Sequence, residues 1–165
     1  MELQQCWMCY LKAEKLMEHG YWPEAHQLYG EVLDHLPNHI HQALENENIK
    51  PCQFSCLLSG LRDATVAQSE ILNQMGQQQR AFTTLNQCYA LLQFISLETS
   101  YLVQRTMTLI DNKSEDILRH MGVFCRAQRD AQWMLKYEHI QKAHHHFAKL
   151  RVTADPRHAT HLLNG

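Results

Sequence analysis

Glycine and proline are scarce in this chain of 165 residues, with six and four copies. A fold of many short β-strands needs a turn about every 8–12 residues, and so few turn-forming residues cannot supply them. The stretches between them are rich in Leu, Ala, Gln, Glu and Met, which favour helices. Because 45 % of the residues are hydrophobic, the chain can bury a core of its own. We therefore predict an all-α fold.

Long apolar runs are missing as well. No run of about 18 apolar residues occurs, so we expect no membrane span and no membrane partner. The opening stretch MELQQCWMCY has an early glutamate and no basic segment followed by an apolar one, so we expect no signal peptide. Six cysteines without such a signal indicate reduced thiols, and we expect a cytoplasmic protein.

Sequence signatures of catalysis are also missing. The chain contains no G-x-S-x-G elbow, no glycine-rich phosphate loop and no H-E-x-x-H metal motif. Asp63 and Glu70 are seven residues apart on a predicted helix, but such a pair is more typical of a surface than of acid–base catalysis. We expect a protein that is not an enzyme and that needs no cofactor.

Positive charge is not in excess, since the formal net charge is −2. Residues 1–112 contain six Lys or Arg against twelve Asp or Glu, and residues 113–165 contain nine against five. The basic residues of the second part are interleaved with acidic ones, so we expect no nucleic-acid partner. The acidic front and basic back could steer a protein partner or a second copy, or could be a solvated surface without a role.

Two helices separated by a tight turn are predicted in the first 37 residues. Small and apolar residues recur every three or four positions from Cys6 to Met17, and Gly20 stops that helix. Pro23 opens a second helix at its first turn, where a missing N–H costs nothing. Pro37 is expected to end the second helix.

The stretch HGYWPEAHQLYGEVLDHLP resembles the tetratricopeptide repeat, whose turn and second helix read roughly Gly-x-aromatic-x-Glu-Ala-x-x-x-Tyr/Phe-x-x-Ala-Leu-x-x-x-Pro. The residues in register are Gly20, Trp22, Glu24, Ala25, Tyr29, Leu33 and Pro37. Val32 stands where the family prefers alanine. In the preceding helix, Cys9 and Lys12 stand where the family usually has tryptophan and leucine.

A second stretch, SEILNQMGQQQRAFTTLNQCYALL, is similar to the same plan, with Gly76 in the place of Gly20. The two glycines are 56 residues apart, instead of about 34 as in a tight array. Between them, residues 38–51 are expected to form a loop with one short helix, and residues 52–74 one long helix that Gly60 bends. The resemblance implies antiparallel hairpins near 6–39 and 62–95.

The rest of the chain is helical in character but matches no repeat. We expect long C-terminal capping helices over 97–150, with a turn at 111–116 and a helix start at Ser114. Residues 151–165 are expected to form a flexible tail. Residues 1–150 would then make a single domain.

Stacked tetratricopeptide hairpins use their first helices to line a concave groove that holds a peptide or a partner helix. The resemblance therefore implies an adaptor, co-chaperone or regulatory protein, with chaperones of secretion-system components as the sharpest version. The implied groove positions are Trp7, Tyr10, Glu14, Met17, Glu18, Asp63, Val66, Glu70, Asn73 and Gln74. Trp7 and Tyr10 would be aromatic anchors, and the acidic positions would prefer a basic or amphipathic segment.

Several alternatives remain open. The groove could be filled from within, and an incomplete stack of apolar helices leaves room for a homodimer. A rival from another class is a helical bundle that binds a metal or cofactor through cysteine and histidine clusters. Its candidate ligands are Cys6, Cys9, Cys52 and Cys56 for zinc, and His139 and His146 with Glu138 or His145 for a transition metal. Core packing of the cysteines and a solvated histidine helix are the competing interpretations.

Overall fold

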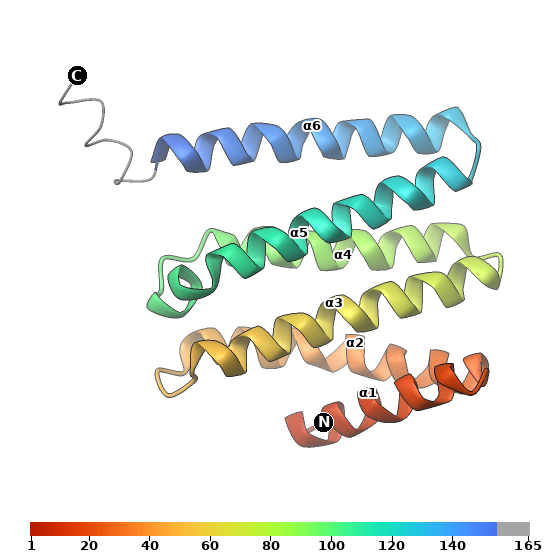
Figure 1. Ribbon diagram of the computed structural model, residues 1–165, viewed down its shortest axis with the longest axis horizontal. Helices are drawn as coiled ribbons and strands as arrows, with labels where there is room; N and C mark the ends of the chain where they lie inside the picture. Colours follow the sequence, from red (N-terminus) through yellow and green to blue (C-terminus); the bar gives the residue numbers. More distant parts are fainter. Residues whose placement is uncertain (155–165) are drawn as a thin grey trace. The chain divides into compact units, whose positions relative to one another are not determined.

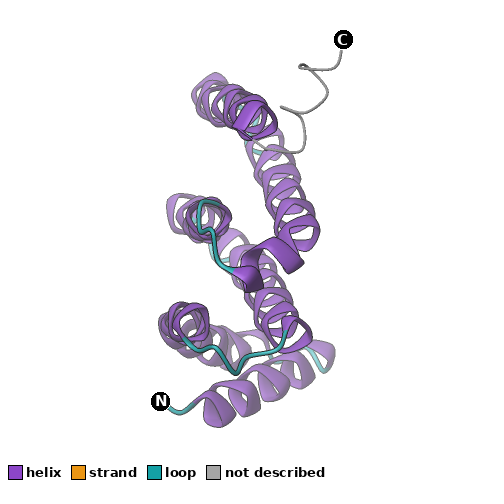
Figure 2. Ribbon diagram, turned by 90° about the vertical axis from the view of Figure 1, so that its left-hand side faces the viewer, coloured by secondary structure: helices purple, strands orange, loops and turns teal. Residues whose placement is uncertain are grey.

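The computed structural model describes residues 1–154, which form helices joined by short loops (Figures 1 and 2). In chain order the helices are α1 (Leu3–Glu18), α2 (Trp22–Glu45), α3 (Pro51–Gln74), α4 (Gln78–Ser96), α5 (Tyr101–Ala127) and α6 (Ala131–Ala154). No strand occurs among these residues, so the all-α prediction is confirmed. Within the same range, no helix is both long enough and apolar enough to cross a bilayer.

The chain divides into two compact units, Met1–Met121 and Gly122–Gly165. In the first unit, consecutive helices pack against each other, α1 with α2, α2 with α3, and α3 with α4 (Figure 1). The second unit contains the end of α5 and the helix α6. The single domain expected over 1–150 stays a prediction.

The same turn ends α1 and α3. Gly20 and Gly76 have φ angles of +80° and +76°, a left-handed conformation that glycine adopts without steric cost. After α1, the N–H of Tyr21 donates to the carbonyl of Leu16 at 2.8 Å, and the N–H of Gly20 donates to that of Met17 at 3.1 Å. The turn around Gly76 repeats both bonds at 2.9 and 3.0 Å. This Schellman arrangement satisfies the last carbonyls of each helix, as predicted for Gly20.

Small residues let the helices of each hairpin approach. Ala13 of α1 and Ala25 of α2 are both fully buried. In the second hairpin, the buried Ser69 of α3 donates from its hydroxyl to the carbonyl of Ala81 in α4 at 3.1 Å. Ala13 and Ser69 stand seven residues before Gly20 and Gly76, so both hairpins have a small residue at the same position.

Pro37 does not end the second helix, because α2 continues through it to Glu45. An internal proline costs about 3 kcal/mol. The extension buries Ile40 (0 % exposed) and Ala43 (5 %) on the same stripe as Leu36, and fully burying an isoleucine alone recovers about 1.5–3 kcal/mol. The predicted loop over 38–51 therefore shrinks to residues 46–50.

The predicted turn at 111–116 is also wrong, since these residues lie inside α5. Ile110, Ser114, Ile117 and Met121 recur every three or four residues and are all 0 % exposed, so burial of this stripe overrides the local preference of Asp, Asn and Ser for turns. The capping helices predicted over 97–150 are α5 and α6, which meet at a turn over 128–130 that the sequence did not reveal. The tail predicted over 151–165 lies outside the described residues, except that 151–154 belong to α6.

Candidate functional site

Aromatic side chains of α1 support a surface shared with α3. The rings of Trp7 and Tyr10 are stacked with their centroids 5.1 Å apart. Trp7 also lies over Gly60 of α3, where a Cβ atom would come within 2.9 Å of the indole ring. Gly60 thus allows the close approach of Trp7, and α3 continues through it. Trp7 is 37 % exposed and Tyr10 only 6 %, so Trp7 offers contact area while Tyr10 packs beneath it.

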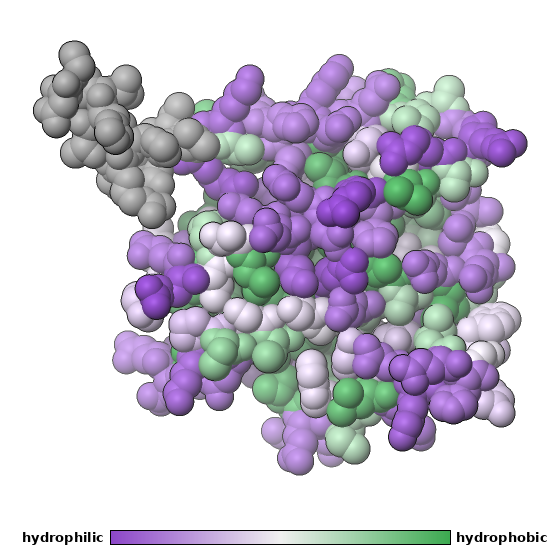
Figure 3. All heavy atoms as spheres, in the orientation of Figure 1, coloured by the Kyte–Doolittle hydropathy of each residue, from purple (hydrophilic) through white to green (hydrophobic). Residues whose placement is uncertain are grey.

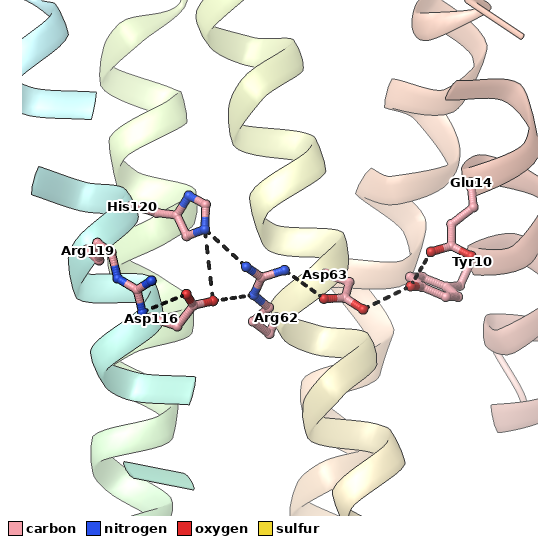
Figure 4. A network of polar contacts seen from close by, with 7 residues as sticks. All are labelled: Tyr10, Glu14, Arg62, Asp63, Asp116, Arg119 and His120. Atoms are coloured by element: carbon pink, nitrogen blue, oxygen red, sulfur yellow. Dashed lines mark hydrogen bonds and ion pairs between the residues drawn. The ribbon is translucent and has the colours of Figure 1, made fainter. Parts of the chain in front are cut away.

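Two carboxylates from different helices converge on the hydroxyl group of Tyr10 (Figure 4). The oxygen lies 2.6 Å from Oε1 of Glu14 in α1 and 3.4 Å from Oδ2 of Asp63 in α3. A phenol has a single proton to donate, and the shorter distance assigns it to Glu14. Asp63 therefore places a second negative charge beside the hydroxyl group, and Tyr10 neutralises little of that charge.

Arg62 carries the polar contacts onward from α3 to α5 (Figure 4). It donates from Nη1 to Asp63 at 2.9 Å and from Nε to Asp116 at 2.5 Å. Its Nη2 lies 3.1 Å from Nε2 of His120, and Asp116 also pairs with Arg119 at 3.1 Å. One guanidinium group therefore holds together groups from both helices.

The ion pairs that Asp116 makes with Arg62 and Arg119 differ in burial and therefore in strength. The side chains of Arg62 and Asp116 are 25 % and 21 % exposed, whereas that of Arg119 is 70 % exposed. A surface pair of the latter kind contributes about 0–1 kcal/mol. Burial alone would raise the pKa of Asp116, but its hydrogen bond with Arg62 outweighs this and lowers it. The Arg62–Asp116 pair is thus the contact that ties α3 to α5.

His120 joins the network from α5 through its Nε2 atom. This atom lies 3.1 Å from Nη2 of Arg62 and 3.9 Å from Oδ2 of Asp116. His120 thus contacts both members of the Arg62–Asp116 pair.

The pKa values of two tyrosines report a negative potential near α1 and α3. Burial first, and then the hydrogen bond to Glu14 and the charge of Asp63, raise the pKa of Tyr10. Tyr29 of α2 meets Tyr10 edge-on at 6.5 Å, and burial followed by the charges of Glu14 and Asp63 raises its pKa to about 12. Burial would disfavour a charge of either sign, so only the smaller contribution from Glu14 and Asp63 reflects negative charge at this point.

The ten predicted groove positions differ in exposure. Trp7, Glu18, Glu70, Asn73 and Gln74 are exposed, Glu14, Met17, Asp63 and Val66 are half-buried, and Tyr10 is buried. The structure brings Tyr10, Glu14 and Asp63 together, but burial of Tyr10 makes it a support and leaves Trp7 as the accessible aromatic. Figure 3 shows hydrophobic side chains scattered among hydrophilic ones over α1 and α3.

The chain matches no family model, and no curated protein or solved structure is similar to it. Its resemblance to the tetratricopeptide repeat stays a prediction from the sequence. Function has to be argued from the chemistry of the site.

The candidate metal ligands lie apart from this network. Cys6 is buried on α1, and burial followed by the neighbouring Cys9 thiol raises the pKa of Cys6, which disfavours the thiolate that zinc binds. Cys52, Cys56, Glu138, His139, His145 and His146 are all exposed. Across the described residues, no three His, Cys, Asp or Glu side chains come together in a geometry that could hold a metal ion.

Sequence reasoning missed four members of the network, Arg62, Asp116, Arg119 and His120. The helix predicted from Ser114 already places Asp116 three and four residues before Arg119 and His120, the spacing of helical ion pairs, so that spacing was the available signal for the last three.

Proposed function

We propose that this protein is a non-enzymatic module that binds a basic or amphipathic segment of another protein. The binding surface, called the α1/α3/α5 face, consists of Trp7, Glu14 and Glu18 of α1, Arg62, Asp63 and Glu70 of α3, and Asp116, Arg119 and His120 of α5. The observation that carries the proposal is the convergence of Glu14 and Asp63 on Tyr10, at 2.6 and 3.4 Å, beside the exposed edge of Trp7.

Charge identifies the chemistry of the partner. Among the α1 and α3 residues of this face there are four carboxylates (Glu14, Glu18, Asp63 and Glu70) and one guanidinium group, that of Arg62. Such an excess attracts lysine and arginine side chains and speeds their encounter with the surface. The indole of Trp7 adds apolar area and a π-face on which a cation can rest.

Binding explains this polar network better than catalysis does. The guanidinium group of Arg62 is engaged by Asp63, Asp116 and His120 and is not presented to a substrate. The lowered pKa of Asp116 keeps it ionised, so it cannot act as a general acid near neutral pH. Together with the tetratricopeptide-like turns, this supports a cytoplasmic adaptor or co-chaperone, of which a secretion-system chaperone is the most specific version.

A selection from a random peptide library tests the proposal. We expect peptides enriched on the full chain to be rich in Lys and Arg or amphipathic, and to bind a Glu18→Lys/Glu70→Lys variant at least tenfold more weakly. Both residues are exposed, so the substitutions should leave the fold intact. The matched control is Glu47→Lys/Glu98→Lys, which makes the same charge change at exposed positions in loops. Equal loss in both variants, or enrichment of acidic peptides, would refute the proposal.

A further inference from the structure

A second surface lies where α1 and α2 form the first hairpin of the chain. An open hollow of about 450 Å³ is lined there by Met8, Cys9, Leu11, Lys12, Lys15 and Leu28. Met8 is 62 % exposed and Leu11 45 %. A hollow of this size, with the flexible Met8 and the apolar Leu11 at its rim, can receive a side chain from a partner surface.

The end of a helical stack normally presents a polar face to solvent. Figure 1 shows α1 at the end of the helices of the first unit, and Met8 and Leu11 of this helix are exposed, so this end is apolar. Exposed apolar area of this kind marks an interaction site.

The charges around the hollow are arranged in two opposite stripes. Lys12 and Lys15 stand on α1. On α2, Glu24 and Glu31 stand four residues before and three residues after Leu28, so they flank it on the same side of the helix. None of these four side chains makes an ion pair in the part of the chain that the structure describes.

We infer that this surface binds a second copy of the same chain, with α1 of each copy lying over α2 of the other. In that two-fold arrangement, the basic stripe of each copy faces the acidic stripe of the other. Met8 and Leu11 of each copy fill the hollow of the other. A surface that carries both its own cations and their anions is self-complementary, which is what a two-fold interface requires.

The size of the surface sets the strength of the dimer. The 16 residues of α1 span about 24 Å, and two helices side by side are about 20 Å wide, which gives roughly 500 Å² per copy. The two copies together would bury roughly 1,000 Å², the low end for specific interfaces. We therefore expect a reversible dimer with a dissociation constant on the order of micromolar.

This surface and the α1/α3/α5 face meet along α1. Leu11 stands four residues after Trp7 and seven before Glu18, so it shares a side of the helix with both, whereas Lys12 is turned about 160° away from Glu14. Glu24 and Glu31 of α2 belong to the dimer surface alone, so their variant tests the dimer independently, and failure of the dimer would leave the peptide-binding proposal untouched.

The test is a charge exchange measured by sedimentation equilibrium of the full chain between about 1 and 100 µM. We expect wild type to dimerise and Met8→Glu to weaken the dimer at least tenfold. Lys12→Glu/Lys15→Glu and Glu24→Lys/Glu31→Lys should each be monomeric alone, because each places like charges opposite each other. Mixed in equal amounts, the two variants should form a heterodimer, which also shows that both are folded.

A matched control is Arg126→Glu/Lys142→Glu, which reverses two exposed charges elsewhere and should dimerise as wild type does. The inference is overturned if wild type stays monomeric at 100 µM, which would assign the hollow to a different occupant. It is equally overturned if Met8→Glu leaves the dimer unchanged, or if the mixed variants give folded circular dichroism spectra but no heterodimer.

Discussion

Arg62 occupies the position in the first unit where most polar contacts meet. It donates to groups on its own helix and on α5, and its side chain is only 25 % exposed. Lysine could not replace it, since three donors pointing in different directions from a planar group are a property of guanidinium. Asp116 depends on it most, because this carboxylate is 21 % exposed and would otherwise lack a buried partner.

Replacing Arg62 by methionine should therefore destabilise the first unit. Methionine keeps the aliphatic stem but leaves Asp116 partly buried without its main donor, which costs about 1–3 kcal/mol. The measurement is urea unfolding followed by circular dichroism. Arg119→Met removes an exposed partner of the same carboxylate and should change the unfolding free energy by less than about 0.5 kcal/mol. An equal effect of both substitutions would show that Arg62 has no special role.

The stability supplied by Asp116 should depend on pH. Its pKa is lower in the folded protein than in the unfolded chain, where it is about 3.9. The contribution is therefore complete well above that value and is lost as the pH falls through the folded pKa. The difference in unfolding free energy between wild type and Asp116→Asn should be largest near pH 7 and shrink below about pH 4. The exposed neighbour Glu115, changed to glutamine, serves as the control, and a difference that grew on acidification would contradict the assignment.

At the scale of the helices, the three turns between hairpin helices share a residue with a positive φ angle but not its identity. Gly20 and Gly76 hold their positive φ angles without strain, whereas Arg129 adopts φ of 52° at the turn between α5 and α6. The N–H of Arg129 donates to the carbonyl of Arg126 at 3.2 Å, as that of Gly20 does to Met17. Asp130 follows Arg129 and accepts the N–H of Gln132 at 2.9 Å, which caps the start of α6. The third turn thus keeps the positive φ angle and lacks the glycine that made the first two visible.

Substitutions at these turns should have opposite signs. Gly76→Ala places a Cβ atom on a residue in the left-handed region. No neighbouring atom lies within 4 Å of it, so backbone strain alone should cost about 1 kcal/mol. Arg129→Gly should relieve similar strain and stabilise α6 by a few tenths of a kcal/mol after the entropy of glycine is counted. Amide hydrogen exchange of the flanking helices is the measurement. Stabilisation by Gly76→Ala would contradict this view of the turns.

The helices that the sequence predicted well are those that begin at a proline or end at a glycine. The turn at Gly20 and the long helix before Gly76 follow from local chemistry. The helix end predicted at Pro37 and the turn predicted at 111–116 are wrong, because burial of the stripes through Ile40 and Ile117 outweighs local preferences. Burial depends on neighbours that are distant in sequence. The acidic half of the site was implied by the resemblance to the tetratricopeptide repeat, whereas the link from Arg62 to Asp116 required the contact between α3 and α5.

At the scale of the whole molecule, the first hairpin takes part in two surfaces of different chemistry. The α1/α3/α5 face carries excess carboxylates, while the surface formed by α1 and α2 is apolar with one basic and one acidic stripe. Binding of a basic segment to the α1/α3/α5 face should weaken as salt rises, because exposed charges are screened beyond about 8 Å at physiological ionic strength. Dimerisation, which rests partly on Met8 and Leu11, should fall less steeply. Titrations of a Lys-rich peptide and of the dimer between about 50 and 500 mM salt would compare the two, and an equal salt dependence would contradict this division.

Site-specific photo-crosslinking in the cell tests the proposed binding face most directly. A benzoylphenylalanine placed at Asn73, exposed on α3 three residues after Glu70 of the α1/α3/α5 face, should capture a Lys- and Arg-rich or amphipathic segment of another protein, to be identified by mass spectrometry. The same group at Thr83, exposed on α4, should not capture that segment. Capture from Asn73 alone is the predicted result. No adduct at Asn73, or the same adducts at both positions, would contradict a binding role for the α1/α3/α5 face.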